Sequence, residues 1–275
     1  MPRGNTQDTR HQSPLDLAAT VRDADVLNMV DRALSAGEVL MAYQPVMQAQ
    51  APGRVAFYEG LVRVLDATGR VIPAVQFMGE AEHSELGRKL DCQSLRLGLK
   101  ALRAHPQLRL SVNMSARSIG YKPWRHVLNR FLKQDPTLGE RLILEISEKS
   151  AMTVPEIVSG FMDEHQRDGI SFAMDEFGSG MAAIKYLKDF CFDAVKIDGQ
   201  LTTGISANAD HQVMMSALMS VARHFDMFTV ATRVEQAVDA DYLMAIGVDC
   251  VQGYLYGVPA VRPPWLGKPD NRLFG

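Results

Sequence analysis

Short apolar runs alternate with longer segments of helical periodicity along most of the chain. The apolar runs are bounded by turn residues and polar residues, and such runs are typical of strands buried on both faces. The segments between them place apolar residues three or four positions apart, as an amphipathic helix does. Strands that alternate with helices in this way indicate a parallel sheet covered by helices, and therefore an α/β fold.

The pattern predicts about eight strands and eight helices. The expected strands are residues 39–46, 54–65, 108–114, 142–146, 170–174, 193–197, 227–232 and 248–252. The expected helices are residues 23–35, 74–85, 90–104, 124–133, 155–168, 181–188, 210–225 and 238–245. Eight such units suggest a TIM-like (β/α)8 barrel. A hairpin-like connection at Gln48–Gly53 joins the first two strands, so we expect one antiparallel strand near the start and an irregular barrel.

The two ends of the chain differ from the middle. Residues 1–16 are rich in polar residues, Pro and Gly, and we expect residues 1–22 to form a mobile N-terminal tail. Residues 23–262 then form one barrel domain, and residues 263–275 form a C-terminal tail. No linker divides the part between the tails.

Composition excludes several classes of protein. The 275 residues are 47% hydrophobic and 22% charged, with a net charge of −3, which gives no sign of a nucleic-acid polymer as partner. No signal peptide and no apolar run long enough for a membrane span are visible, so we expect a soluble, cytoplasmic protein without a membrane span. The three cysteines, Cys92, Cys191 and Cys250, are widely spaced and suit a reducing compartment.

The stretch from Ile170 to Gly180 concentrates candidate chemistry. Its apolar start predicts a buried strand, which ends in the adjacent acids Asp175 and Glu176. Burial of such a pair is unfavourable unless a cation or hydrogen-bond donors meet it. Taken alone, the pair could equally be the solvated cap of the next helix.

Polar residues also follow the other predicted strands. They are Glu59, Asn113, Glu145, Asp175 with Glu176, Lys196, Thr232 with Glu235, and Gln252. The strand ends of a TIM-like barrel meet at one rim, where its chemistry is located. Carboxylates that converge there with an amide oxygen suit a hard cation such as Mg²⁺ or Mn²⁺, and no His/Cys cluster indicates zinc. This combination suggests metal-assisted phosphate chemistry.

The same residues lie in motifs that resemble the EAL-domain family, which comprises cyclic di-GMP phosphodiesterases and their degenerate binding relatives. The resemblance runs from about Val39 to Pro259. It comprises nine motifs in the order of the family: YQPV (43–46), EGLVR (59–63), VIPAVQF (71–77), SVNMS (111–115), LEISE (144–148), DEFGSG (175–180), VKID (195–198), VATRVE (230–235) and VQGYLYG (251–257).

The resemblance implies a role for each matching position. Positions that hold the first metal ion match Glu59, Asn113, Glu145 and Asp175, and the second acid of the family's pair is Glu176 in this chain. Catalytic positions match four residues: Lys196 and Gln252, which act near the attacking water, Glu148, which holds the loop after the acid pair, and Glu235. Ligand-binding positions match Gln44, Leu61, Arg63 and Pro73, with Arg63 facing a phosphate.

Three departures from the family pattern affect the expected activity. Thr232 and Arg233 replace the Glu-Gly of E-G-V-E, and that glutamate helps to hold the second metal ion in the family. Glu176 replaces an aspartate and is one methylene longer. The loop sequence MAAI at 181–184 lacks the Tyr-Ser-Ser expected there. We therefore expect one Mg²⁺ or Mn²⁺ ion rather than two.

Because two ions act together in a two-metal hydrolase, loss of one should impair chemistry more than binding. We expect a cyclic di-GMP signalling domain that binds the dinucleotide and hydrolyses it poorly or not at all. The alternatives are an active phosphodiesterase that yields the linear dinucleotide pGpG, and a barrel scaffold for protein interaction that binds no nucleotide. A homodimer and a regulatory protein partner are further expectations.

Overall fold

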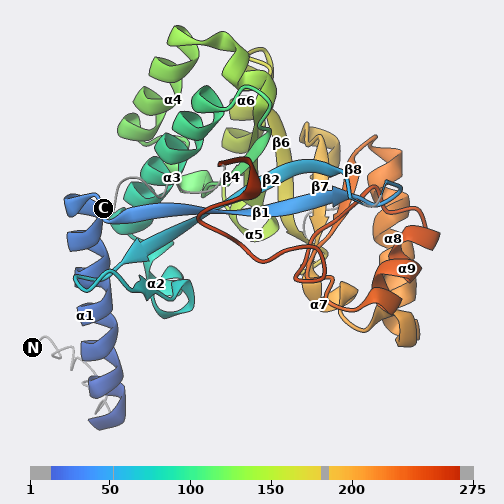
Figure 1. Ribbon diagram of the computed structural model, residues 1–275, viewed down its shortest axis with the longest axis horizontal. Coiled ribbons are helices and arrows are strands. Elements are labelled where there is room, and N and C mark those ends of the chain that lie inside the picture. The colour runs from blue at the N-terminus through green and yellow to red at the C-terminus, as the bar shows by residue number, and fades with distance from the viewer. Residues whose placement is uncertain (1–13, 52, 181–185, 267–275) are drawn as a thin grey trace, which may run out of the picture.

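The chain forms a closed barrel with helices around it (Figure 1). The computed structural model describes residues 14–51, 53–180 and 186–266. Nine strands hydrogen-bond in the order β1-β9-β8-β7-β6-β5-β4-β2-β3, and β1 also pairs with β2, which closes the ring and leaves β3 outside it. The predicted TIM-like (β/α)8 barrel is therefore confirmed.

The elements agree with the predicted alternation. The strands are β1 (Val39–Gln48), β2 (Val55–Leu65), β3 (Val71–Ile72), β4 (Leu110–Asn113), β5 (Leu142–Ser147), β6 (Ser171–Phe177), β7 (Ala194–Ile197), β8 (Phe228–Ala231) and β9 (Cys250–Val251). The α-helices are α1 (Pro14–Ala36), α2 (Met78–Ala81), α3 (Glu85–Ala104), α4 (Lys122–Gln134), α5 (Glu148–Ala151), α6 (Pro155–Gln166), α7 (Gly199–Thr202), α8 (Ala209–His224) and α9 (Ala237–Ala245).

The irregularity of the barrel lies at its first strand. β1 pairs antiparallel with both of its neighbours, with Gln44 opposite Glu59 on β2 and Met47 opposite Val251 on β9. The other neighbouring pairs around the ring are parallel. The expected antiparallel strand near the start is confirmed.

The first two strands also extend past the rim of the parallel strands and carry a second hydrophobic core. The short strand β3 pairs with the end of β2, and α1 packs against β2 and α3. Buried side chains from these elements form this second core: Val30, Ala33, Val64, Ile72, Phe77, Ala81, Leu86 and Leu90. It is separate from the main core, which lies inside the barrel and between the barrel and its helices.

The predicted start of the first helix is wrong. α1 begins at Pro14 rather than near Asp23, so residues 14–22 are helical. The backbone conformation of proline suits the first turn of a helix. The backbone N–H that proline lacks would have no partner within the helix in that turn, so Pro14 is compatible with the earlier start. Residues 1–13 lie outside the described part of the chain.

Three other expected segments differ in detail. The helix expected at 74–85 is divided into a 3-10 turn, Ala74–Gln76, and α2. Most of the helix expected at 181–188 lies outside the described residues, and a 3-10 turn follows at Leu187–Asp189. The expected C-terminal tail begins with the 3-10 turn Pro264–Leu266, where the Trp265 ring packs edge-on against Tyr43 with centroids 4.9 Å apart.

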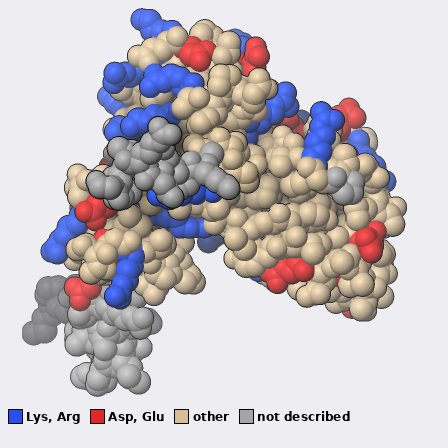
Figure 2. All heavy atoms as spheres, in the orientation of Figure 1, with Lys and Arg blue, Asp and Glu red and all other residues tan. Residues whose placement is uncertain are grey.

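Charged residues are distributed unevenly over the face shown in Figure 2. Lys and Arg are frequent over α3 and α4, whereas the region of α8 and α9 shows mostly other residues. Exposed apolar side chains in that second region include Val213 on α8 and Val238 on α9. No helix in the described part of the chain has an apolar stretch long enough to cross a membrane.

Candidate active site

The strand register places the predicted site residues inside the barrel. Residues paired between neighbouring strands point to the same face, and every second residue along a strand returns to that face. The register pairs Gln44 with Glu59 and Asn113 with Glu145. It also puts Asp175, Lys196 and Gln252 on the interior face of β6, β7 and the residue after β9. Apolar strands that end in inward polar residues therefore bring these groups to one rim.

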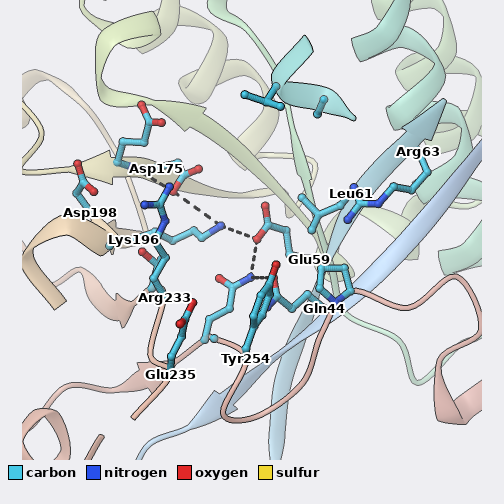
Figure 3. Close-up of a pocket in the computed structure, with 18 residues that line it drawn as sticks. Gln44, Glu59, Leu61, Arg63, Asp175, Lys196, Asp198, Arg233, Glu235 and Tyr254 are labelled. Atoms are coloured by element: carbon cyan, nitrogen blue, oxygen red, sulfur yellow. Dashed lines mark hydrogen bonds and ion pairs between the residues drawn. The ribbon is translucent and has the colours of Figure 1, made fainter. Parts of the chain in front are cut away.

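A cavity of about 800 Å³ opens at this rim (Figure 3). Its size is within the range of small-molecule sites. The residues that line it are Gln44, Glu59, Leu61, Arg63, Ala74, Val75, Asp175, Glu176, Lys196, Asp198, Gly199, Thr232, Arg233, Glu235, Gln252, Gly253, Tyr254 and Pro259.

Lys196 is the centre of the polar network at the floor of the cavity. Its Nζ lies 2.6 Å from Oε2 of Glu145, 2.9 Å from Oε2 of Glu59 and 3.8 Å from Oδ1 of Asp175. Lys196, Glu59 and Glu145 are all buried. A buried ammonium group with three carboxylates around it balances part of their charge, which makes their burial tolerable.

Two amide side chains complete the contacts of Glu59. Asn113 Nδ2 donates to Oε1 of Glu59 at 2.7 Å, and Gln252 Nε2 donates to Oε2 at 2.6 Å. Gln252 Nε2 also lies 3.2 Å from Oε1 of Gln44, whose own amide donates to the Gly257 carbonyl at 3.1 Å. These bonds fix the orientation of the Glu59 carboxylate between the lysine and the amides.

Burial and charge shift the pKa values of this network in different directions. Burial alone would raise the pKa of Glu59, but Lys196 and the hydrogen bonds from Gln252, Lys196 and Asn113 hold it below its usual value. Burial and repulsion from Glu59 raise the pKa of Glu145 to about 8. Burial raises the pKa of Asp175 as well. Burial alone would lower the pKa of Lys196, but the surrounding carboxylates raise it well above its usual value, so the lysine is charged at neutral pH.

The oxygen ligands at the rim suit a hard divalent cation in type. Glu59, Asn113, Glu145 and Asp175 offer carboxylate and amide oxygens, and Oε1 of Glu145 is buried without a hydrogen-bond partner. Within the described residues, however, no three His, Cys, Asp or Glu side chains are grouped around one point as metal ligands would be. The acids instead surround the Lys196 ammonium group.

The second residue of the acid pair, Glu176, adopts a strained backbone conformation. Glu176 has a φ of 55°, in the left-handed region, and its backbone N–H donates to Oδ1 of Asp175 at 2.9 Å. Burial and the neighbouring Asp175 raise the pKa of Glu176. Oε2 of Glu148 accepts a hydrogen bond of 2.9 Å from the N–H of Gly178, so Glu148 contacts the loop that follows the pair.

The TRVE segment forms another wall of the cavity. The Thr232 hydroxyl donates to the Ile197 carbonyl at 2.7 Å, and the Thr232 carbonyl accepts from the Thr202 hydroxyl. Arg233 has a φ of 54°, also in the left-handed region, and both Arg233 and Glu235 line the cavity. Thr232 is thus engaged with the backbone of β7.

Not every predicted site residue lies on the cavity surface. Glu145 lies beneath it, and Asn113 lines an adjoining cavity of about 350 Å³ that shares Asp175 and Glu176. Glu148 acts on the loop behind the cavity. Pro73 does not line the cavity, whereas its neighbours Ala74 and Val75 do.

Several lining residues were not among the predicted site residues. Asp198 directly follows the end of β7, so the rule that polar residues at strand ends form the site could have identified it. Its Oδ1 also accepts from the N–H of Gln200 and caps α7. Tyr254 and Pro259 lie in the segment after β9, where no periodic pattern indicates which side chains face the cavity.

The chain is similar in sequence to known proteins. Cyclic di-GMP phosphodiesterase PdeB of Shewanella oneidensis is 29% identical over 89% of this chain, and the probable cyclic di-GMP phosphodiesterase PdeA of Escherichia coli is 28% identical over 87%. The chain spans only 29% and 33% of the lengths of these two relatives.

Solved structures share the fold at lower identity. The FimX EAL domain of Pseudomonas aeruginosa, bound to c-di-GMP, has a TM-score of 0.78 at 24% identity and covers 86% of this chain and 97% of its own. The FimX EAL domain of Xanthomonas citri, in complex with c-diGMP, has a TM-score of 0.78 at 23% identity and covers 90% of this chain and 98% of its own.

The sequence model of the EAL domain matches residues 27–259, which include the whole barrel and every motif discussed above. The agreement of sequence, strand topology and rim residues leads to one assignment. This chain belongs to the EAL domain family.

Proposed function

We propose that this EAL domain binds cyclic di-GMP and hydrolyses it poorly or not at all. Binding is supported by a cavity of suitable volume with Arg63 and Leu61 on its wall. It is also supported by the relatives, which are named as cyclic di-GMP phosphodiesterases, and by the FimX structures, which hold this ligand.

One observation carries the proposed loss of hydrolysis. Where the family pattern has a glutamate, Thr232 offers a hydroxyl, and that hydroxyl donates to the Ile197 carbonyl. Next to it, Arg233 adds a positive charge to the cavity wall. A carboxylate is therefore replaced by a neutral group at the position that helps to hold the family's second ion, and a second cation is disfavoured there.

The remaining oxygen ligands would hold one Mg²⁺ or Mn²⁺ ion. Glu59, Asn113, Glu145 and Asp175 would bind it, after Lys196 has given up part of its contact with the carboxylates. When bound, the ion supplies positive charge that stabilises a phosphoryl group during its displacement. Lys196 and Gln252 would orient a water through their N–H groups, and Glu148 would keep the loop after the acid pair in place.

An active phosphodiesterase is the second candidate. It is favoured by the complete set of first-ion residues together with Lys196 in one buried network. The two candidates differ in the product that they release, since only an active enzyme converts the cyclic dinucleotide to pGpG.

Calorimetry and chromatography test the proposal together. Titration of the protein with cyclic di-GMP should give a dissociation constant in the micromolar range or lower, and absence of heat would instead indicate a scaffold without nucleotide binding. Incubation with Mg²⁺ or Mn²⁺, followed by chromatography, should leave most of the nucleotide cyclic. Formation of pGpG at about 1 s⁻¹ or faster, an ordinary enzymatic rate, would contradict the proposal in favour of the active enzyme.

A further inference from the structure

Arg233 lines a cavity large enough for a ligand, and its positive charge has no partner among the described residues. Its side chain is exposed and lines the cavity, and it forms no ion pair or hydrogen bond with the residues that the structure describes. Its φ of 54° is the left-handed conformation that a non-glycine residue adopts at a free-energy cost. A strained backbone at a cavity wall is a frequent mark of a functional position.

The Arg233 side chain lies close to the backbone of Gly199. A Cβ atom placed on Gly199 would lie 2.8 Å from Cβ of Arg233 and closer still to its Cγ and Cδ. The aliphatic part of Arg233 therefore passes directly over the backbone at the start of α7. Only glycine leaves this space, so Gly199 allows the stem of Arg233 to lie along this wall, and Arg233 lines the cavity there.

Arg233 and Arg63 lie on opposite sides of the cavity. Figure 3 shows Arg63 beyond Leu61 at one end and Arg233 beside Lys196 at the other, with Glu59 between them. A guanidinium group offers several donors in a planar fork that matches phosphate oxygens. Two such groups at two ends suit a ligand with two separated phosphodiesters, each with one negative charge, as cyclic di-GMP has.

The wall next to Arg233 would otherwise repel a phosphate. Asp175 and Asp198 lie in the same part of the cavity as Arg233 and have carboxylate groups. Glu176, which directly follows Asp175, also lines the cavity. In a two-metal site a second ion would compensate for such charges. In this chain Thr232 supplies no carboxylate for that ion, and Arg233 brings a fixed positive charge to the same wall.

We propose that Arg233 binds one phosphate of cyclic di-GMP in place of the second divalent ion, and that Arg63 and Arg233 together allow this domain to bind its ligand without any added metal. This inference rests on the proposed function, and it assigns to Arg233 a binding role of its own. The charge of an arginine does not depend on metal supply, so binding becomes independent of the concentration of divalent ions.

Calorimetry of the full chain with cyclic di-GMP in the presence of EDTA tests this role. The wild-type protein should bind, and Arg233→Gly and Arg233→Gln should each weaken binding by about 10- to 100-fold, as expected for loss of a charged hydrogen-bonded contact. Addition of Mn²⁺ should change the wild-type affinity by less than about threefold and should partly restore binding by Arg233→Gly. Gly199→Ala should also weaken binding, because a methyl group there displaces the Arg233 stem.

Three controls separate binding from folding. Glycine adopts a left-handed φ without strain, so Arg233→Gly should not lower the temperature of thermal unfolding. Asp226 also has a φ of 54°, and it lies before β8, at the opposite end of that strand from Thr232. Asp226→Gly therefore makes the same backbone change as Arg233→Gly and should leave binding unchanged. Arg130→Gln removes a positive charge from the exposed surface of α4 and should also leave binding unchanged.

The outcomes distinguish this inference from the proposed function. If the wild-type protein binds in EDTA and Arg233→Gly and Arg233→Gln bind equally well, the role of Arg233 is wrong and the proposed function stands. If the wild-type protein binds only with Mn²⁺, metal-independent binding is wrong. If the wild-type protein does not bind with or without Mn²⁺, the proposed function fails and this inference fails with it.

Discussion

The ammonium group of Lys196 donates a hydrogen bond of 2.6 Å to the carboxylate of Glu145, and both side chains are buried at the rim of the barrel. The same ammonium group lies 2.9 Å from Glu59. Removal of one partner from a buried ion pair leaves an uncompensated charge, and that costs more than the pair contributes as a whole. The rim network therefore links the stability of the fold to the residues of the candidate active site.

Lys196→Met should lower the free energy of unfolding by about 3–5 kcal/mol, because it leaves the buried carboxylate of Glu59, whose pKa is held below its usual value, without its cation. Urea denaturation at pH 7 measures this. Lys89→Met is the matched control: its ion pair with Asp31, 2.8 Å long, is exposed and should contribute less than about 1 kcal/mol. Equal losses in the two variants would show that the network does not stabilise the barrel.

The alternation of strands and helices made the rim predictable from sequence. Glu59, Glu145 and Asp175 each stand at an interior position of an apolar strand or at its end, and parallel strands bring their carboxyl ends to one edge. The sequence pattern could therefore identify these residues and the barrel that holds them. The register within each strand then decided which of them face inward.

Contacts between loops could not be predicted in the same way. The approach of Arg233 to Gly199 depends on two segments that follow different strands, and no periodicity relates their positions. The bond from Thr232 to the Ile197 carbonyl depends likewise on how β8 ends beside β7. The sequence pattern does not predict the start of α1, because residues 1–16 form one polar segment, although Pro14 can begin a helix.

Asp91 should make the stability depend on pH. Its Oδ2 accepts hydrogen bonds from the Ser118 hydroxyl and the Ser115 N–H, yet burial raises its pKa from 3.8 to about 7. Between these two values the unfolded chain has lost the proton that the folded chain retains. The folded state then binds more protons, so the contribution of Asp91 to the free energy of unfolding falls as pH rises through this interval and levels off above about pH 7.

Urea denaturation at several pH values measures this effect. Asp91→Asn keeps an oxygen that accepts both hydrogen bonds, but its side chain cannot ionise. The free energy of unfolding of the wild-type protein should fall by an amount on the order of 1–4 kcal/mol between about pH 4 and pH 8, and Asp91→Asn should not show this fall. Ser118→Ala removes a hydrogen bond that lowers the pKa of Asp91, and it should extend the loss to higher pH. Parallel curves for the wild-type protein and Asp91→Asn would contradict the prediction.

The second hydrophobic core should hold α1 on the barrel. Val30 on α1 is fully buried, in the same core as Val64 and Phe77, so Val30→Asp should release the helix because an unpaired charge is not tolerated there. Hydrogen exchange should become faster in α1 and β3 and stay slow in β5 and β6. Met29→Asp changes the preceding residue, which is 41% exposed, and should have little effect. Equally fast exchange in both variants would show that the core does not hold α1.

Restoring a carboxylate at position 232 should restore part of the hydrolysis. The comparison uses Arg233→Gly alone and with Thr232→Glu, because the arginine would pair with the new acid and compete with a metal ion. Loss of the 2.7 Å bond from Thr232 to the Ile197 carbonyl should cost about 1 kcal/mol of stability, which the fold can tolerate. With Mn²⁺, chromatography should show pGpG formed at least about tenfold faster by the double variant than by Arg233→Gly, in keeping with a second ion that stabilises the transferred phosphoryl group.

Thr232→Gln with Arg233→Gly is the matched control, because glutamine has similar bulk without charge, and it should give no gain in the rate of hydrolysis. If both double variants are equally slow, the missing carboxylate is not the defect, and the longer Glu176 becomes the position to shorten to aspartate.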